Sequence, residues 1–426
     1  MKAIRKYCSS MFIVLAYIFL AQVSQAQNNE APQKKNASTI IVPQILFSGV
    51  LFENREKNQV LYVPNVFELF PANTVEGFVF NPQVKFTQNY EDGQFFSLNP
   101  NLRYGFGNER FQAQLKTQYF YNPKKNGLLE LSGGRAIEQL YDESTLGALN
   151  NTFYAFALSE NFLKTYERSY IEFSQTASPF KNILLRTTFS WNQRNPLNNL
   201  TKYKKDEEIT SNNPENIELA NTAFAKNTAV LFEAQLRWQI GHQLERRRGQ
   251  LISTGKYPAF TLTYTNSIDE IFGSDRSYQK LSFSIQDDYE IGYHRGRLFF
   301  EIGDFLKKDN LTFVDFNHFK GKETVYGTYD NNQFQLLEYY SSSTAEFYVQ
   351  GHYEHYFEPR FTIKDYVKFQ PVLGAHYLFT EVGGHFTELG VGIDQMLGSD
   401  WRVDLYNSWR DAKHESFGVR IGMNFD

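Results

Sequence analysis

Strict alternation of apolar and polar side chains, repeated along most of the chain, is the feature that most limits its fold. Between Phe232 and Ile240, apolar residues occupy every second position, and polar residues such as Glu233 and Arg237 fill the positions between them. The stretches 111–119, 260–265, 281–286 and 401–410 follow the same rule. Successive side chains of a β-strand point to opposite faces, whereas helical faces repeat about every 3.6 residues. The pattern therefore predicts many amphipathic strands, and 334–341 and 345–356 are among the stretches expected to form them.

The length of these strands favours a membrane over water as the solvent outside. Most run for about 9–12 residues, which matches the span of a tilted strand across a bilayer, whereas soluble strands average about 5–6 residues. Aromatic residues make up 17% of the chain, and several, such as Tyr119, Trp191 and Trp409, lie near strand ends, where membrane interfaces would meet them. An open edge in lipid leaves backbone groups unpaired. We therefore expect an all-β fold, a closed antiparallel transmembrane β-barrel of about 12 to 16 strands.

The polar faces of the strands would line the lumen of such a barrel. The residues expected there are Gln112, Lys116, Glu233, Arg237, Arg402 and Asp404. Their mixed charge suits a water-filled pore, but it equally suits a narrow interior in which opposite charges pair. The stretch 45–53 is expected either to add a strand or to plug the lumen.

The N-terminus has the pattern of a signal peptide. Lys2, Arg5 and Lys6 precede the apolar stretch 11–21, which is too short for a membrane-spanning helix of about 20 residues. Small residues before Gln27 predict cleavage between Ala26 and Gln27. We expect a signal peptide at 1–26, a flexible lead-in at 27–40 and an outer-membrane β-barrel domain at 41–426. The single cysteine lies in the signal peptide, so the mature chain would hold no disulfide.

The C-terminus resembles the last strand by which outer-membrane barrels are recognised by their insertion machinery. The residues that form this signal are Phe417, Val419, Ile421, Met423 and Phe425. The expected location is the outer membrane of a Gram-negative cell, and the expected partners are membrane lipid, the insertion machinery and possible envelope proteins.

Two connections between the predicted strands are long. The stretch 195–227 is rich in Asn, Lys, Glu and Asp and predicts a surface loop. The stretch 137–166 has helix-like spacing and predicts a short helix over or in the mouth of the barrel.

Short segments spread over the chain resemble a family of outer-membrane β-barrels of unknown function. They are residues 73–78, 150–154 with Asn161 and 166–168, 194–198, 317–321 and 352–355. Members of that family often carry an N-terminal carboxypeptidase-regulatory-like domain, for which we expect no room here. The resemblance implies a barrel fold and an outer-membrane location, and it implies no activity.

The residue patterns of enzymes and cofactor-binding proteins are missing from the sequence. The run His352-Tyr-Glu-His355 resembles a zinc motif, but on a strand the two histidines would face opposite ways. Neither a nucleophile elbow nor a phosphate-binding glycine loop occurs. The formal net charge of −4 is also unlike that of a nucleic-acid binder. We expect no catalytic residue, metal or cofactor, and no nucleic-acid partner.

Three functional hypotheses follow from the sequence. The first, which the sequence favours, is a channel or another transport-related role, with solute passing along the polar faces. The second is a structural or assembly partner in the outer membrane whose barrel is plugged. A membrane-embedded enzyme is the weakest of the three, because no nucleophile set supports it. A continuous lumen would favour the first hypothesis, and an interior blocked by part of the chain would favour the second.

Overall fold

The computed structural model of the chain describes residues 49–141, 154, 162–200, 211–241, 243–247, 250–254, 258–330, 332–359, 361–363, 367–396 and 401–423. The predicted signal peptide with its cleavage site at Ala26 and Gln27, the lead-in 27–40 and Phe425 lie outside the described residues. Most of the stretch 137–166, in which a helix was expected, also lies outside them.

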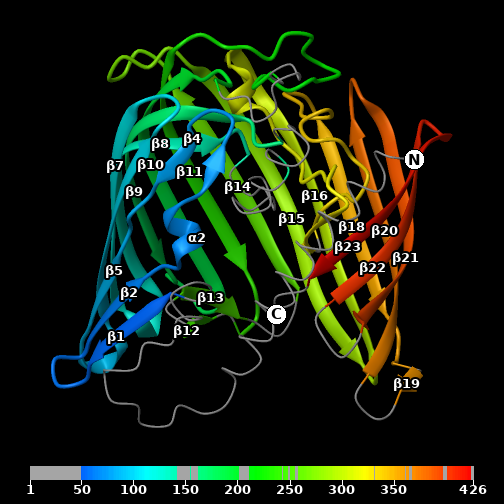
Figure 1. The fold of residues 1–426 in the computed structure, drawn as a ribbon, viewed down its shortest axis with the longest axis horizontal. Coiled ribbons are helices and arrows are strands. Elements are labelled where there is room, and N and C mark those ends of the chain that lie inside the picture. The colour runs from blue at the N-terminus through cyan, green and yellow to red at the C-terminus, as the bar shows by residue number, and fades with distance from the viewer. Residues whose placement is uncertain are drawn as a thin grey trace.

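A single 21-stranded sheet makes up most of the described structure (Figure 1). Its strands are β1 (Val50–Asn54), β2 (Gln59–Val63), β3 (Ala72–Asn73), β4 (Gly77–Phe80), β5 (Lys85–Asn89), β6 (Phe95–Gly105), β7 (Arg110–Asn122), β8 (Gly127–Gln139), β9 (Thr165–Ala177), β10 (Ile183–Pro196), β11 (Asn227–Trp238), β14 (Ala259–Ile268), β15 (Ser277–Ile291), β16 (His294–Asn310), β17 (Tyr326–Thr328), β18 (Tyr348–Tyr356), β19 (Phe361–Ile363), β20 (Val367–Thr380), β21 (Gly384–Met396), β22 (Trp401–Arg410) and β23 (Lys413–Met423). A separate hairpin consists of β12 (Gln243–Arg247) and β13 (Gln250–Thr254). The helical elements of the described residues are single turns: α2 (Val66–Leu69), η3 (Glu91–Gly93), η4 (Pro123–Lys125) and η5 (Phe313–Asp315).

The strands follow one another as an antiparallel meander. Hydrogen-bonded neighbours run from β1 through β2, β5, β6 and onward to β16, then through β18, β20, β21 and β22 to β23. The one parallel pair joins β17 to β23. Figure 1 shows the sheet curling round an interior, with the blue N-terminal strands on one side and the red C-terminal strands on the other.

The prediction of a closed barrel of about 12 to 16 strands is wrong for this structure, whereas the short helix expected in a long loop lies largely outside the described residues. In the described part of the chain, no backbone pairing joins β1 to β23, so the sheet is not closed, and it has 21 strands. Part of the free edge of β23 is taken by β17, which pairs Tyr326 with Ile421 and Gly327 with Gly422. Alternation in the sequence determines which side chains share a face of each strand. It does not show which segment pairs with the edge strands β1 and β23.

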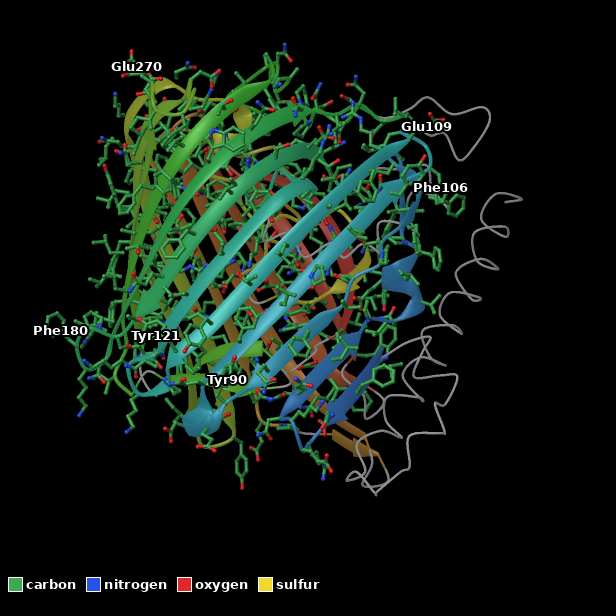
Figure 2. All side chains as sticks on the ribbon, turned by 90° about the vertical axis from the view of Figure 1, so that its left-hand side faces the viewer. Tyr90, Phe106, Glu109, Tyr121, Phe180 and Glu270 are labelled. Carbon is green, nitrogen blue, oxygen red and sulfur yellow. The ribbon has the colours of Figure 1, made fainter. Side chains whose placement is uncertain are left out.

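The two ends of the sheet differ in their connections. Strand β8 is joined to β9, β10 to β11, β14 to β15 and β16 to β18 at one end of the sheet, which we call the long-loop end. The turns 90–94, 123–126, 178–182 and 292–293 lie at the opposite end, which we call the short-turn end. Figure 2 shows the tilted strands and places Phe106, Glu109 and Glu270 at the long-loop end, with Tyr90, Tyr121 and Phe180 at the short-turn end.

The distribution of apolar and charged side chains is the reverse of that in a water-soluble protein, in which apolar residues are buried and charged residues are exposed. On β21, Leu389, Val391 and Ile393 are exposed on the outer face, while Glu388, which directly precedes Leu389, is buried on the inner face. On β22, Leu405 is likewise exposed and Arg402 is fully buried. The exposed side of the sheet is therefore largely apolar, and the buried side carries charged residues.

One further strand assignment differs from the expectations from sequence. The stretch 334–341, expected to be a strand, has no regular structure and lies largely buried inside the sheet. The stretch 45–53, expected to add a strand or to plug the lumen, contributes residues to β1, while its first residues, 45–48, lie outside the described part. The position of 334–341 determines the candidate site.

Candidate functional site

The interior of the sheet is occupied by the connection between β16 and β18, residues 311–347, which we call the inner segment. Two of its runs lie against each other, because Lys322 donates its backbone N–H to the carbonyl of Leu337 (2.9 Å) and Phe334 donates to the carbonyl of Lys320 (2.8 Å). A Cβ atom at Gly321 would lie 2.4 Å from the carbonyl oxygen of Leu337, so this close approach requires glycine. The segment thus forms a compact unit inside the sheet.

Apolar side chains of the inner segment pack against the strands on the C-terminal side of the sheet. Phe319, Phe334 and Leu337 form one buried cluster with Tyr348, Leu378 and Phe386 of the neighbouring strands. The ring of Phe334 lies 4.5 Å from the His352 ring, centroid to centroid. Burial of such aromatic rings supplies part of the free energy that keeps the segment inside.

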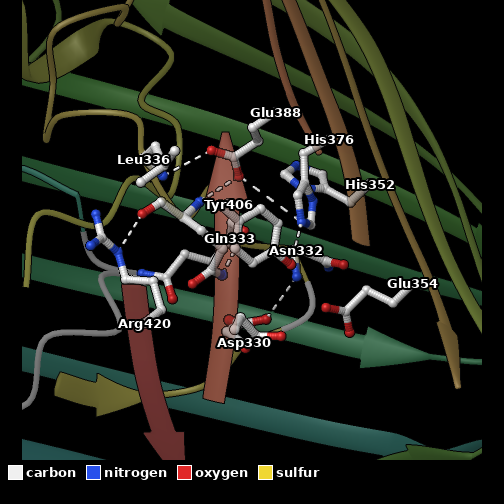
Figure 3. A network of polar contacts seen from close by, with 12 residues as sticks. Asp330, Asn332, Gln333, Leu336, His352, Glu354, His376, Glu388, Tyr406 and Arg420 are labelled. Atoms are coloured by element: carbon white, nitrogen blue, oxygen red, sulfur yellow. Dashed lines mark hydrogen bonds and ion pairs between the residues drawn. The ribbon is translucent and has the colours of Figure 1, made fainter. Parts of the chain in front are cut away.

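Two charged strand residues bind the backbone of the inner segment (Figure 3). The carboxylate of Glu388 on β21 accepts the backbone N–H groups of Gln335 and, at 2.8 Å, of Leu336. Arg420 on β23 donates to the carbonyls of Gln335 (2.5 Å) and Lys322 (3.2 Å). Because buried backbone groups need partners, these two side chains fix the path of the segment.

A cluster of buried charges lies beside these contacts and centres on Arg402. Its guanidinium donates to Asp404 (2.8 Å), Glu354 (2.9 Å) and the hydroxyl of Tyr356 (3.0 Å). It also stacks on the ring of Tyr329, which belongs to the inner segment, at 3.8 Å from the centroid. Tyr329 donates its hydroxyl proton to Glu354. The inner segment is therefore part of this charge cluster.

A pair of imidazoles lies next to Phe334. The Nδ1 atoms of His352 on β18 and His376 on β20 are 2.9 Å apart, and both rings are buried. Glu354 shares the inner face of β18 with His352, whereas His355 lies on the other face, where it contacts His294 (3.1 Å). Among the residues that the structure describes, no group of three or more His, Cys, Asp or Glu residues is placed to hold a metal ion.

The first part of the inner segment is attached to the opposite side of the sheet. Arg194 on β10 donates to Asp315 at 2.5 Å, and both side chains are buried. Phe313 and Phe316 pack with Tyr278 of β15 and Phe305 of β16. The inner segment thus bridges the interior, from Arg194 on β10 to Arg420 on β23.

Lys322 is an unusual member of the inner segment, because its ammonium is buried and makes no hydrogen bond within the described structure. Burial, together with the nearby guanidinium of Arg420, lowers the pKa of Lys322 to about 7. In the same segment, burial lowers the pKa of His318 to about 3, so this imidazole is neutral when it contacts the hydroxyl of Ser343 at 2.8 Å.

The six residues predicted to face a lumen divide into two groups. Arg402 and Asp404 are buried and belong to the charge cluster described above. Gln112 is buried on β7, Lys116 lies half-exposed at 3.6 Å from Glu130, and Arg237 contacts Gln239 (3.2 Å). Glu233 lies on β11 opposite Thr188 and Thr265. A role for these six residues in solute passage stays a prediction.

The residues of the predicted C-terminal signal lie on β23 as far as the structure describes them. Phe417 and Val419 are exposed on the outer face, and Ile421 and Met423 lie in the stretch that pairs with β17. Recognition by the insertion machinery stays a prediction.

Sequence reasoning missed the residues that hold the inner segment. Glu388 and Arg420 each occupy an ordinary polar position of an alternating strand, and nothing local distinguishes them from exposed polar residues. The run Asn317 to Gly321, one of the segments that resemble the barrel family, lies in the inner segment. The remaining signal is the density of Phe, Leu and Tyr in 334–341, a composition that also predicts a strand.

Two of the solved structures that resemble this chain have low sequence identity to it. BamA from Haemophilus ducreyi lacking POTRA domains 1–3 aligns with a TM-score of 0.42 and 10% identity over 82% of this chain and 68% of that chain. CdiB from Acinetobacter baumannii aligns with a TM-score of 0.39 and 8% identity over 83% of this chain and 57% of that chain. Both TM-scores are below 0.5, and no functional argument rests on them.

Sequence comparison identifies the family of the chain. No curated protein matches it. None of the helices in the described structure is long and apolar enough to cross a membrane. The model of one family, described as a family of unknown function (DUF5686), C-terminal domain, matches residues 43–393. The chain therefore belongs to this family.

Proposed function

We propose that this protein resides in the outer membrane of a Gram-negative cell, with the apolar outer face of its sheet against lipid. The reversed polarity supports this location, because exposed apolar residues such as Leu389, Val391 and Leu405 are costly in water and favourable against lipid. Exposed aromatic rings at the turns, including Phe106 at one end and Phe180 at the other, suit the two interfaces.

Within the membrane, the protein acts as a structural or assembly component with a filled interior, not as an open channel. The observation that carries this proposal is the anchoring of the inner segment from both sides, by Arg194 on β10 and by Glu388 and Arg420 on β21 and β23. A solute would have to displace this segment together with its buried aromatic cluster. A catalytic role is not part of the proposal, because the charges of the cluster around Arg402 pair with one another.

An association role also follows from the open sheet. Backbone groups at a sheet edge are costly when they face hydrocarbon. The edges of β1 and β23 that are unpaired in the described structure would therefore need to be covered by protein in the membrane. This need favours a protein that works in contact with other envelope components.

Planar-bilayer recording of the purified full-length protein tests the filled interior. We expect no conductance steps from the wild type. The double variant Glu388→Ala/Arg420→Ala removes both backbone anchors, and we expect it to give steps as the segment leaves the interior. A variant at the rim, Arg410→Ala/Glu415→Ala, removes an exposed ion pair and serves as the control. Steady conductance from the wild type would contradict the proposal.

Location is tested separately by separating the two membranes of the native cell on a density gradient. We expect the mature chain in the outer-membrane fraction and none in the soluble fraction. Recovery from the periplasm without detergent would rule out the membrane proposal whatever the conductance shows.

A gated transport role is the second candidate, and the burial of Lys322 favours it. A charged ammonium without a hydrogen-bond partner weakens the attachment of the inner segment, so protonation of Lys322 would ease its displacement. This candidate predicts that wild-type conductance appears at about pH 5.5 and disappears at about pH 9, since the pKa of Lys322 is about 7. The structural role predicts no conductance at either pH.

A further inference from the structure

A cluster of cations lies on the outer face of the sheet near the long-loop end. Arg110, Arg135 and Lys226 line a hollow of about 470 Å³ together with Glu167 and neutral side chains of β9 and β10. The hollow carries three positive charges and one negative charge. It is separate from the inner segment and from the charge cluster around Arg402.

One buried carboxylate organises two of the cations. Glu167 is only 1% exposed, and its two oxygens accept from Arg135 (2.6 Å) and Arg110 (3.0 Å). Both arginine side chains remain nearly half exposed. A guanidinium has five N–H donors in a fixed plane, so each arginine retains donors for a further anion. Glu167 therefore holds the arginines in place without neutralising the hollow.

The register of the strands places this hollow beside the apolar surface. Ser169 lies opposite Arg135 on β8 and opposite Gln193 on β10, so these residues form one row. The next row of the same face contains Ile171 and Trp191, and the row after it contains Phe173 and Phe189. Ile171 is 61% exposed. Rows on one face are about 7 Å apart, so the cations lie about one row from the start of the apolar surface.

We propose that this hollow binds the phosphate group of a membrane lipid, with the acyl chains of the lipid lying along Ile171, Phe173 and Phe189. Two arginines and a lysine around one hollow match the charge and geometry of a phosphate monoester. The apolar rows next to the hollow suit the hydrocarbon chains of a lipid, which a free phosphate ion lacks. The inference rests on the proposed membrane location, because it assigns the outer face to lipid.

Native mass spectrometry of the full-length protein in detergent tests the proposal. The probe is phosphatidic acid, which carries an exposed phosphate, and diacylglycerol with the same acyl chains is the matched probe without it. We expect retention of phosphatidic acid and loss of diacylglycerol. Inorganic phosphate in excess distinguishes the two sources of the anion: at equal concentration it should not displace the lipid.

The variant Arg135→Gln/Lys226→Gln removes two cations and leaves Arg110 with Glu167. Each lost charge-assisted contact should weaken phosphatidic acid binding by about tenfold. The control variant Lys124→Gln/Lys181→Gln removes the same charge from turns at the short-turn end, and we expect it to bind like the wild type. The single variant Arg135→Lys keeps the positive charge, so it should bind phosphatidic acid more tightly than the double variant. It provides a second test if the double variant folds poorly.

Three results would overturn the proposal. They are equal binding of phosphatidic acid by the wild type and the double variant, equal binding of diacylglycerol, and displacement of the lipid by inorganic phosphate at equal concentration. The third result would identify a plain anion site. These outcomes are independent of the density-gradient and conductance experiments, so failure of the lipid site is distinguishable from failure of the proposed function.

Discussion

Glu388 and Leu336 are separated by 52 residues, yet the carboxylate of Glu388 accepts the backbone N–H of Leu336 at 2.8 Å. The same carboxylate accepts the N–H of Gln335, whose carbonyl in turn accepts Arg420. Side chains of β21 and β23 thus satisfy buried backbone groups that have no neighbouring strand. The position of the inner segment therefore depends on a small number of identifiable residues.

Replacing Glu388 with alanine should loosen the inner segment. Two buried N–H groups would lose their acceptor, at a cost of about 1–3 kcal/mol. Limited chymotrypsin digestion of the folded protein should then cut near Phe334 and Leu337, which are buried in the wild type. The rate of this cleavage is the measurement.

The matched control for this prediction is Glu415→Ala. Glu415 pairs with Arg410 at the exposed rim, and such pairs contribute at most about 1 kcal/mol. We expect this variant to be cleaved at the wild-type rate. Equal cleavage of both variants would mean that Glu388 does not hold the segment.

Much of the sheet could be predicted from the sequence, because alternation is a local property. The apolar positions Leu236 and Trp238 are exposed on the outer face, and the strand that contains them begins at Asn227 and ends at Trp238. Successive side chains of a strand point to opposite faces, so whether two residues share a face depends only on whether an even number of positions separates them. This can be predicted without knowledge of the fold or of the partner strand.

The inner segment could not be predicted in the same way, because its position depends on contacts between distant residues. Phe334 to Tyr340 has the composition of a strand, but its buried backbone groups pair with Glu388 and Arg420 instead of with a neighbouring strand. Closure failed as a prediction for a related reason. Unpaired strand edges are costly in lipid, but this principle does not identify the segment that covers a given edge. In this structure, Tyr326 to Thr328 covers part of the edge of β23.

Arg402→Leu should be the most destabilising single change in the interior. It would leave Glu354 and Asp404 buried without their counterion, and breaking such a pair costs about 3–5 kcal/mol. Urea unfolding followed by tryptophan fluorescence measures the loss. The triple variant Arg402→Leu/Glu354→Gln/Asp404→Asn also removes the two carboxylate charges that are left without a counterion. It should recover part of the lost unfolding free energy. No recovery in the triple variant would argue against charge pairing as the source of stability.

Lys322→Met should stabilise the protein at neutral and acidic pH. The pKa of Lys322 is about 7 in the folded protein, against 10.5 for an ordinary lysine. Between these values the unfolded chain binds one more proton than the folded protein, so wild-type stability rises with pH across this window. Below pH 7 both states are protonated, and the penalty of the buried charge is fully present.

The measurement for Lys322 is the difference in unfolding free energy between Lys322→Met and the wild type, from pH 6 to pH 10. We expect an advantage for the variant on the order of a few kcal/mol at pH 6, since each pKa unit corresponds to about 1.4 kcal/mol. The advantage should shrink steadily between pH 7 and pH 10. A difference that does not change with pH would exclude titration of Lys322 as its cause.

Engineered cysteines can trap the inner segment inside the sheet, because the mature chain is expected to contain none of its own. A Cβ atom at Gly418 on β23 would lie 2.5 Å from Cδ2 of Leu336, so Leu336→Cys/Gly418→Cys should form a disulfide on mild oxidation. The pair Leu336→Cys/Leu389→Cys is the control, because Leu389 is exposed on the outer face and should not cross-link. Gel mobility with and without reductant reports the cross-link.

In planar bilayers, the cross-link should also abolish any conductance steps produced by Glu388→Ala, and reductant should restore these steps. Failure of the Leu336–Gly418 pair to oxidise while the Leu336–Leu389 pair does would place the segment outside the sheet and remove the basis for a filled interior.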